Sequence, residues 1–199
     1  MPDGSSIAVL GFRPHTYWTA AVALGGAREA PEVIERRRID FAAGDERSVY
    51  HHAEQMPRAG AEAWIARTWT AVEANARRGI GEMLAELAVV GVTPQVAIVP
   101  KGRDIKSDRL DDILSSHARI HAAEGNFYRA VVAEACTALG LDVLRVVERD
   151  LPALVGELIG PPSVDERLKA FGRALGAPWS EDQKLATLAA WTALPEDDA

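Results

Sequence analysis

One stripe of polar side chains is the part of the sequence best suited to chemistry. His117, His121, Glu124 and Tyr128 recur at helical spacing, so they share one face of an expected α-helix. Two imidazoles one turn apart, with a carboxylate one turn further on, can bind zinc or manganese. This pattern makes His117, His121 and Glu124 candidate metal ligands, although the spacing is not that of the zinc proteases.

Two other interpretations of this stripe remain open. In the first, His121 and Glu124 share a proton as catalytic residues while Arg119 or Arg129 holds an anion. In the second, which we favour, the stripe is a polar helix margin bonded to loops or to a second subunit. Gly125 is unfavourable in mid-helix by about 1 kcal/mol relative to alanine, which suggests that a neighbour or ligand comes close to the backbone there.

A second polar segment follows the expected strand at residues 95–99. Lys101 and Arg103 lie in this segment, and ligands of open α/β sheets bind at the carboxyl ends of parallel strands. Both are therefore candidate ligand-binding residues, although a solvated loop is the simpler explanation. His51 and His52, in the polar stretch 42–60, are expected at the surface.

The elements that must position these residues begin with three short strands, expected at residues 6–12, 17–25 and 31–41. Arg13-Pro14 is expected to end the first strand, and tight turns join the three into an antiparallel meander. Helices and strands then alternate, which indicates a parallel half of the sheet. They are a helix over about 65–90, a buried strand at 95–99, a helix over about 110–139 and a strand at 142–147. Two capping boxes, Ser163 with Glu166 and Ser180 with Gln183, begin the expected C-terminal helices.

This order of elements resembles the RNase H-like superfamily, and three segments resemble its RuvC-type Holliday-junction resolvases. They are VLGFRPH at 9–15, VAIVP at 96–100 and EDQKLATLA at 181–189. The resemblance implies an α/β fold with a mixed five-stranded sheet, three antiparallel strands followed by two parallel ones, flanked by helices. It also implies a catalytic centre in which carboxylates hold divalent metals that activate water.

The chain departs from the family pattern where the metals would bind. Arg13 replaces the aspartate of the first strand, and Val99 replaces the glutamate of the fourth. Lys184 replaces an inner aspartate of the last helix. Glu181, with its neighbour Asp182, is then the only acidic residue that matches the family pattern. Basic side chains at these positions repel cations. The resemblance therefore implies a lost nuclease centre, in which Arg13 and Lys184 either reach solvent, pair with Glu181, or grip an anion.

Composition limits the remaining possibilities. The chain has 199 residues, 48% of them hydrophobic, and a net charge of −7, which fits one folded domain and disfavours a broad DNA-binding face. No apolar run is long enough to span a membrane. The single cysteine, Cys136, is expected to be an inert core thiol of a cytoplasmic protein. We expect one domain over 1–199, with a sheet core in 1–160 and C-terminal helices in 161–199.

The sequence thus predicts a degenerate RuvC-like domain that binds a protein, a peptide or, less favoured by net charge, a nucleic acid, as a possible homodimer. The expected ligand-binding residues are Arg13, His15, Lys101, Arg103, His117, Arg119, Tyr128, Arg129, Glu181 and Lys184. No cofactor is expected under this hypothesis. One alternative is a metal-dependent phosphodiesterase that uses zinc, manganese or magnesium on relocated ligands, and another is a small-molecule enzyme that uses His121 and Glu124.

Overall fold

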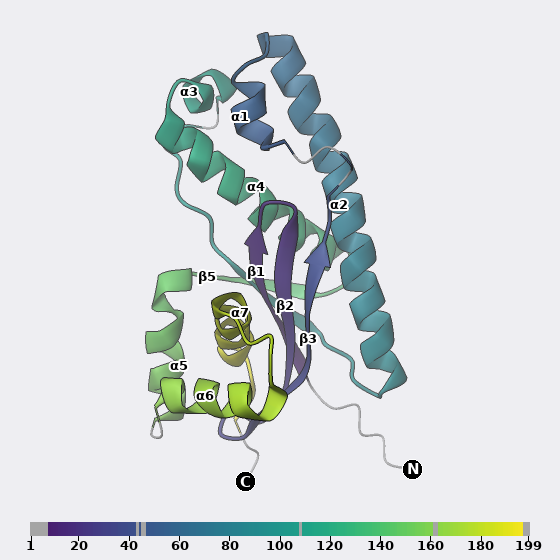
Figure 1. Ribbon diagram of the computed structural model, residues 1–199, viewed down its shortest axis with the longest axis vertical. Helices are drawn as coiled ribbons and strands as arrows, with labels where there is room; N and C mark the ends of the chain where they lie inside the picture. The colour runs from purple at the N-terminus through teal and green to yellow at the C-terminus, as the bar shows by residue number, and fades with distance from the viewer. Residues whose placement is uncertain (1–7, 43, 45–46, 108, 161–162, 197–199) are drawn as a thin grey trace.

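A mixed five-stranded sheet with the strand order β3-β2-β1-β4-β5 forms the centre of the protein (Figure 1). The computed structural model describes residues 8–42, 44, 47–107, 109–160 and 163–196. The strands are β1 (Ala8–His15), β2 (Trp18–Gly26), β3 (Pro31–Asp40), β4 (Val96–Pro100) and β5 (Asp142–Val146). The first three are antiparallel, and β4 and β5 add in parallel beside β1. The mixed five-stranded sheet, its strand directions and its α/β class are therefore confirmed.

The first strand is longer than expected. Residues 6 and 7 of the predicted strand lie outside the described residues, and Arg13-Pro14 does not end it, since β1 pairs with β2 as far as His15 opposite Trp18. The prediction failed because Pro14 lies beyond the segment Val9–Gly11 that pairs with β4. A proline there removes no ladder hydrogen bond on the β4 side. The extension carries Arg13 and His15 away from the centre of the sheet.

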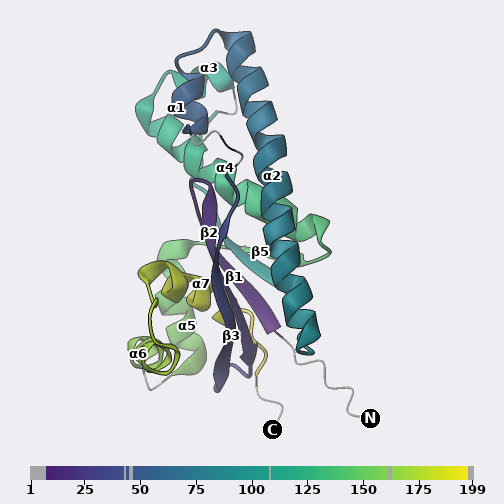
Figure 2. The same ribbon diagram turned by 45° about the vertical axis from the view of Figure 1, so that its right-hand side comes forward.

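Helices cover both faces of the sheet (Figures 1 and 2). One face packs against α2 (Arg58–Val89) and α4 (His117–Ala138) through a core that includes Leu10 and Phe12 of β1. The other face packs against α5 (Leu151–Ile159), α6 (Val164–Leu175) and α7 (Glu181–Trp191). Alternate residues of β1 thus serve opposite cores, as the two-residue period of a strand requires.

Several short elements were not expected. They are α1 (Val49–Ala53), α3 (Leu110–Leu114), a 3-10 turn at Glu148–Asp150, and the helix α5. The predicted helix over 110–139 is two helices, because Ser115 and Ser116 interrupt it. The stretch 42–60, which was predicted to be irregular, contains α1. The polar histidines of this short helix gave no apolar pattern that would predict it. Both capping boxes are confirmed, with reciprocal bonds between Ser163 and Glu166 and between Ser180 and Gln183.

Helix α7 lies directly against the backbone of β1. A Cβ added to Gly11 would stand 1.9 Å from the carbonyl oxygen of Ala186 and 2.7 Å from the amide nitrogen of Ala190. Only glycine allows this approach, which brings the first turn of α7 beside the end of β1. Among the described residues, no helix is both long and apolar enough to cross a bilayer.

Candidate functional site

The end of β1 and the start of α7 are joined by a shared carboxylate. Asp182 accepts a hydrogen bond from Nη1 of Arg13, and its Oδ1 lies 2.8 Å from Nε2 of His15. Nη1 of Arg13 also lies 3.3 Å from the His15 ring. The side chains are only partly exposed, at 24% for Arg13 and 23% for Asp182. Arg13 is therefore held in a fixed position at the end of β1.

A second carboxylate completes this ion-pair network. Nη2 of Arg13 lies 3.5 Å from Oε1 of Glu148, which follows β5 and begins the 3-10 turn. Sequence reasoning missed Glu148, although its place after a parallel strand was the available signal. The Arg13 guanidinium thus bridges two carboxylates, Asp182 and Glu148.

His15 lies between this network and a neighbouring aromatic ring. Its imidazole stacks on Trp18 with ring centroids 4.2 Å apart, and Arg38 lies over the same indole, with its guanidinium carbon 4.1 Å from the ring centroid. Burial is the main cause that lowers the pKa of His15, and Arg13 adds to it, whereas Glu148 raises it. The neutral ring is therefore favoured, and its Nε2–H can donate a hydrogen bond to the Asp182 carboxylate.

A polar cavity of about 270 Å³ opens beside His15, between the β1–β2 turn and α4. We call it the β1–α4 cleft. Its lining consists of Pro14, His15, Thr16, His121, Glu124, Gly125, Tyr128 and Arg129. The structure thus brings together His15 with four of the residues predicted on the helical stripe or beside it.

Arg129 is the main cationic group of this cleft. Its guanidinium folds back over Gly125, where an added Cβ would lie 2.7 Å from Nη1. Burial lowers the pKa of Arg129, as do Arg13 and Arg103, while Glu148 raises it. The close approach that Gly125 was expected to permit is therefore made by a side chain of the same helix.

Further arginines surround the same region. Arg145 of β5 donates to the carbonyl of Pro100 at 3.1 Å, and burial, followed by Arg129, lowers its pKa. Arg103 is exposed, and its backbone is fixed by Asn126, which bonds to the Arg103 amide and carbonyl at 2.8 and 2.7 Å. Four arginines, Arg13, Arg103, Arg129 and Arg145, thus lie near three carboxylates, Asp182, Glu148 and Glu124. Cationic groups are therefore in slight excess here, although the whole chain is acidic.

Glu124 has a role that its position on the stripe did not reveal. It is buried, with an exposed fraction of 7%, and its two oxygens accept hydrogen bonds from the amides of Val49 and Tyr50, each at 2.8 Å. It thus caps the start of α1, a helix that is distant in sequence. This contact gives Glu124 a structural role, and its expected roles as a metal ligand or a proton carrier stay predictions.

The predicted stripe does not lie along a single solvent boundary. His117 and His121 are exposed, whereas Tyr128 is 1% exposed and packs against Tyr17 and Phe41. Burial, with contributions from Tyr17 and Glu124, raises the pKa of Tyr128. Tyr128 therefore forms the floor of the cleft and is not a titrating group at neutral pH. The axis of α4 tilts from solvent into the core, which the spacing alone could not show.

His51 of α1 joins His117 and His121. The ring centroids of His51 and His121 are 4.7 Å apart, and the Nε2 atoms of His117 and His121 are 3.0 Å apart. His52, next to His51, packs instead against Trp64. The sequence predicted both histidines of α1 at the surface, but the structure assigns His51 to a cluster with the two histidines of the stripe.

The basic residue predicted on α7 lies elsewhere. Lys184 is 3.5 Å from the exposed carboxylate of Glu181, and both line a shallow hollow against α5 and α6. Asp182 and Lys184 point about 200° apart around the helix, so Asp182, and not Glu181, faces Arg13. The expected pairing with Glu181 is therefore found for Lys184, whereas Arg13 pairs with Asp182, and the two basic residues do not share one centre. Val99 is completely buried in the core, so that position of β4 offers no carboxylate.

The other predicted residues also have defined places. Lys101 is exposed just after β4, and its amide bonds to the carbonyl of Val146 at 2.6 Å. Arg119 donates to the carbonyl of Asp112 in α3 at 2.9 Å. It lines a small surface hollow that Arg103 shares. Cys136 is buried, and burial raises its pKa to about 12, which agrees with an inert core thiol.

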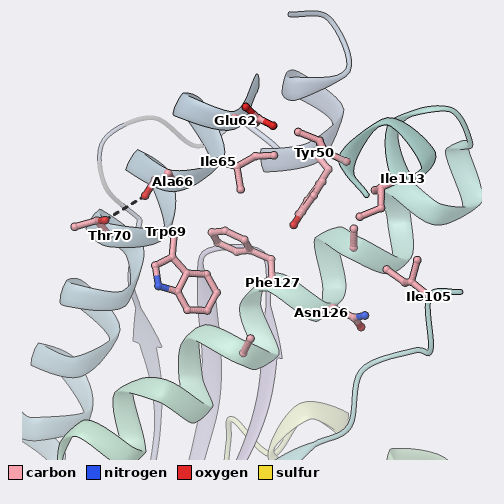
Figure 3. A pocket seen from close by; sticks show the side chains of 13 residues that line it. Tyr50, Glu62, Ile65, Ala66, Trp69, Thr70, Ile105, Ile113, Asn126 and Phe127 are labelled. Atoms are coloured by element: carbon pink, nitrogen blue, oxygen red, sulfur yellow. Dashed lines mark hydrogen bonds between the residues drawn. The ribbon is translucent and has the colours of Figure 1, made fainter. Parts of the chain in front are cut away.

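A mainly apolar cavity lies apart from these charges. It measures about 710 Å³ and lies between α1, α2, α3 and α4 (Figure 3). The rings of Trp69 and Phe127 meet edge to face there, 5.2 Å apart, and Tyr50 enters from α1. The buried Trp64 belongs to the hydrophobic core, and Trp69 packs against it.

Comparisons with known proteins support the fold. No protein-family model matches the chain, and no curated protein matches its sequence. The structure of Thermus thermophilus RuvC in complex with a Holliday junction substrate is similar, with a TM-score of 0.54 and 12% identity over 94% of this chain and 91% of that one. Another Thermus thermophilus RuvC structure gives 0.49 and 13%, over 93% and 92%. The likeness to the first shows a RuvC-like, RNase H-like fold.

Proposed function

We propose that this chain is a non-cleaving RuvC-like domain that binds nucleic acid through the β1–α4 cleft. The observation that carries the proposal is the position of Arg13, which bridges Asp182 and Glu148 at the end of the first strand. Two-metal hydrolysis needs carboxylates that are free to coordinate cations. Here both carboxylates already neutralise a guanidinium that is part of the fold.

The charges around the cleft favour an anionic ligand. Arg129 lines this cleft, and Arg13 and Arg103 lie near enough to act on its charge. The guanidinium of Arg129 is partly buried, with an Nε that has no hydrogen-bond partner within the described residues. Guanidinium groups bind phosphate oxygens through paired, charge-assisted hydrogen bonds. The similar Thermus thermophilus protein is described with a Holliday junction substrate. A phosphate backbone is therefore the ligand class that this surface fits best.

Fluorescence anisotropy with a labelled four-way junction, a duplex and a single strand tests the proposal. Binding should weaken steeply with salt, and Arg129→Ala should reduce both the affinity and the salt slope, the latter by about 1. Arg149→Ala is the matched control, since Arg149 is 87% exposed on the adjacent 3-10 turn. The absence of binding to all three DNAs at low salt would reject a nucleic-acid ligand. In that case a protein or peptide partner becomes the favoured hypothesis.

A further inference from the structure

The three histidines His51, His117 and His121 carry an inference that is independent of DNA binding. Each offers one ring nitrogen, and these nitrogens all lie within 4.8 Å of one another. The closest pair, Nε2 of His117 and Nε2 of His121, is 3.0 Å apart. Two nitrogens bound to one tetrahedral zinc at about 2.0–2.1 Å lie roughly 3.3 Å apart. The spacing of this pair already suits a shared ion.

The third ligand is positioned by the fold and not by sequence proximity. Glu124 caps α1 through the amides of Val49 and Tyr50, which holds the short helix, and with it His51, against α4. His117 and His121 follow each other by one turn on α4, so their rings project from the same side. A capped helix therefore brings the ring of His51 up to two preorganised imidazoles.

The same carboxylate also lies behind the third ring. Nδ1 of His51 is buried, has no hydrogen-bond partner within the described residues, and lies 3.9 Å from Oε2 of Glu124. Histidines that bind metals usually donate their other ring N–H to a carboxylate or carbonyl, which fixes the tautomer and strengthens the ligand. With Nδ1 facing Glu124, Nε2 of His51 is the nitrogen that is available to a metal.

We propose that His51, His117 and His121 form a zinc site, with Glu124 as the positioning residue for His51. Three neutral imidazoles favour zinc and other late first-row metals over magnesium, which prefers oxygen ligands. Three protein ligands leave a fourth coordination position for water or an anion. Because His121 also lines the β1–α4 cleft, the ion would add positive charge at the edge of that cleft.

Isothermal titration of tag-free protein with zinc chloride, at fixed pH, tests this site directly. The wild type should bind one zinc per chain, and magnesium should not compete. His121→Ala and His117→Ala should each weaken zinc binding at least 100-fold. Both rings are exposed, so these variants should keep their fold, which circular dichroism would verify. Glu124→Gln should weaken binding 10- to 100-fold.

His52→Ala is the matched control, because His52 belongs to the same short helix but packs against Trp64. It should bind zinc as the wild type does. The cobalt-substituted protein should show the intense visible absorption of a four-coordinate site, and His121→Ala should lose it. The proposal is overturned if the wild type binds zinc no better than His121→Ala, or if His52→Ala loses as much affinity as the cluster variants.

Discussion

The guanidinium of Arg129 lies over Gly125, one turn earlier on α4, where an added Cβ would stand 2.7 Å from its Nη1. Glycine at position 125 therefore leaves space for the Arg129 side chain, which explains its presence in a helix despite its low helix propensity. Its missing side chain lets a cationic group lie flat in the β1–α4 cleft instead of extending into solvent. Alanine at this position would favour helix stability, whereas glycine favours the proposed binding of a ligand by Arg129.

Gly125→Ala should separate these two demands. The free energy of unfolding should stay unchanged or rise by up to about 1 kcal/mol, because alanine is the better helix former. The affinity for DNA should fall several-fold, because the Cβ displaces the Arg129 guanidinium. Urea denaturation and fluorescence anisotropy measure the two effects. A variant that loses stability while it keeps its affinity would contradict this view of Gly125.

Gly11→Ala, in contrast, should lower the free energy of unfolding. Its Cβ would stand 1.9 Å from a backbone oxygen of α7, which cannot move aside as a flexible side chain can. We expect a loss of at least about 3 kcal/mol of unfolding free energy, in the range of severe core overpacking. Gly81→Ala on α2 is the control, since its nearest contact is an ordinary 3.6 Å. If the two substitutions cost the same in urea denaturation, the close contact between β1 and α7 is not present in solution.

Arg13→Asp should turn the ion-pair network into a cation site. The substitution removes the positive charge and places a third carboxylate beside Asp182 and Glu148, the type of group that magnesium and manganese prefer. We expect this variant to be less stable than the wild type without metal and to gain thermal stability when either ion is added. The wild type should show no such gain. An equal gain in both proteins would show that Arg13 does not exclude metal.

Stability should depend on pH through His15. Its pKa is lowered in the folded state, mainly by burial and then by Arg13, while its unfolded value stays near 6.5. The unfolded chain therefore binds more protons, so the contribution of His15 is complete above pH 6.5 and is lost as the pH falls towards the folded pKa. Urea denaturation from pH 7.5 to 5.5 should show a steeper loss for the wild type than for His15→Gln. Parallel curves would contradict a perturbed His15.

The sequence predicted the sheet well because its signals are local. Alternating or continuous apolar runs marked the strands, and both capping boxes marked the C-terminal helices. The polar site was harder to predict because its contacts are distant in sequence. Asp182 reaches Arg13 across the fold, and Glu124 reaches the amides of α1. Sequence spacing does not show which distant segments come into contact. The helical spacing therefore predicts one continuous surface for the stripe, although Glu124 and Tyr128 are buried in the structure.

The choice of the acidic residue on α7 has a similar explanation. Matching the family motif by sequence selected Glu181, whereas the orientation of the helix turns Asp182 towards β1. One residue on a helix is a rotation of about 100°, so a small error in alignment changes which side chain enters the site. His51 was missed because α1 is too short to give a periodic signal.

Cleavage of a four-way DNA junction by the purified protein tests the central claim most directly. The assay should use magnesium, manganese and zinc in turn, with binding to the same junction measured in parallel. The account predicts that the junction is bound in a salt-dependent way and remains intact with every metal. Metal-dependent cleavage that disappears in Asp182→Asn would contradict it, because Asp182 would then be serving a metal and not Arg13.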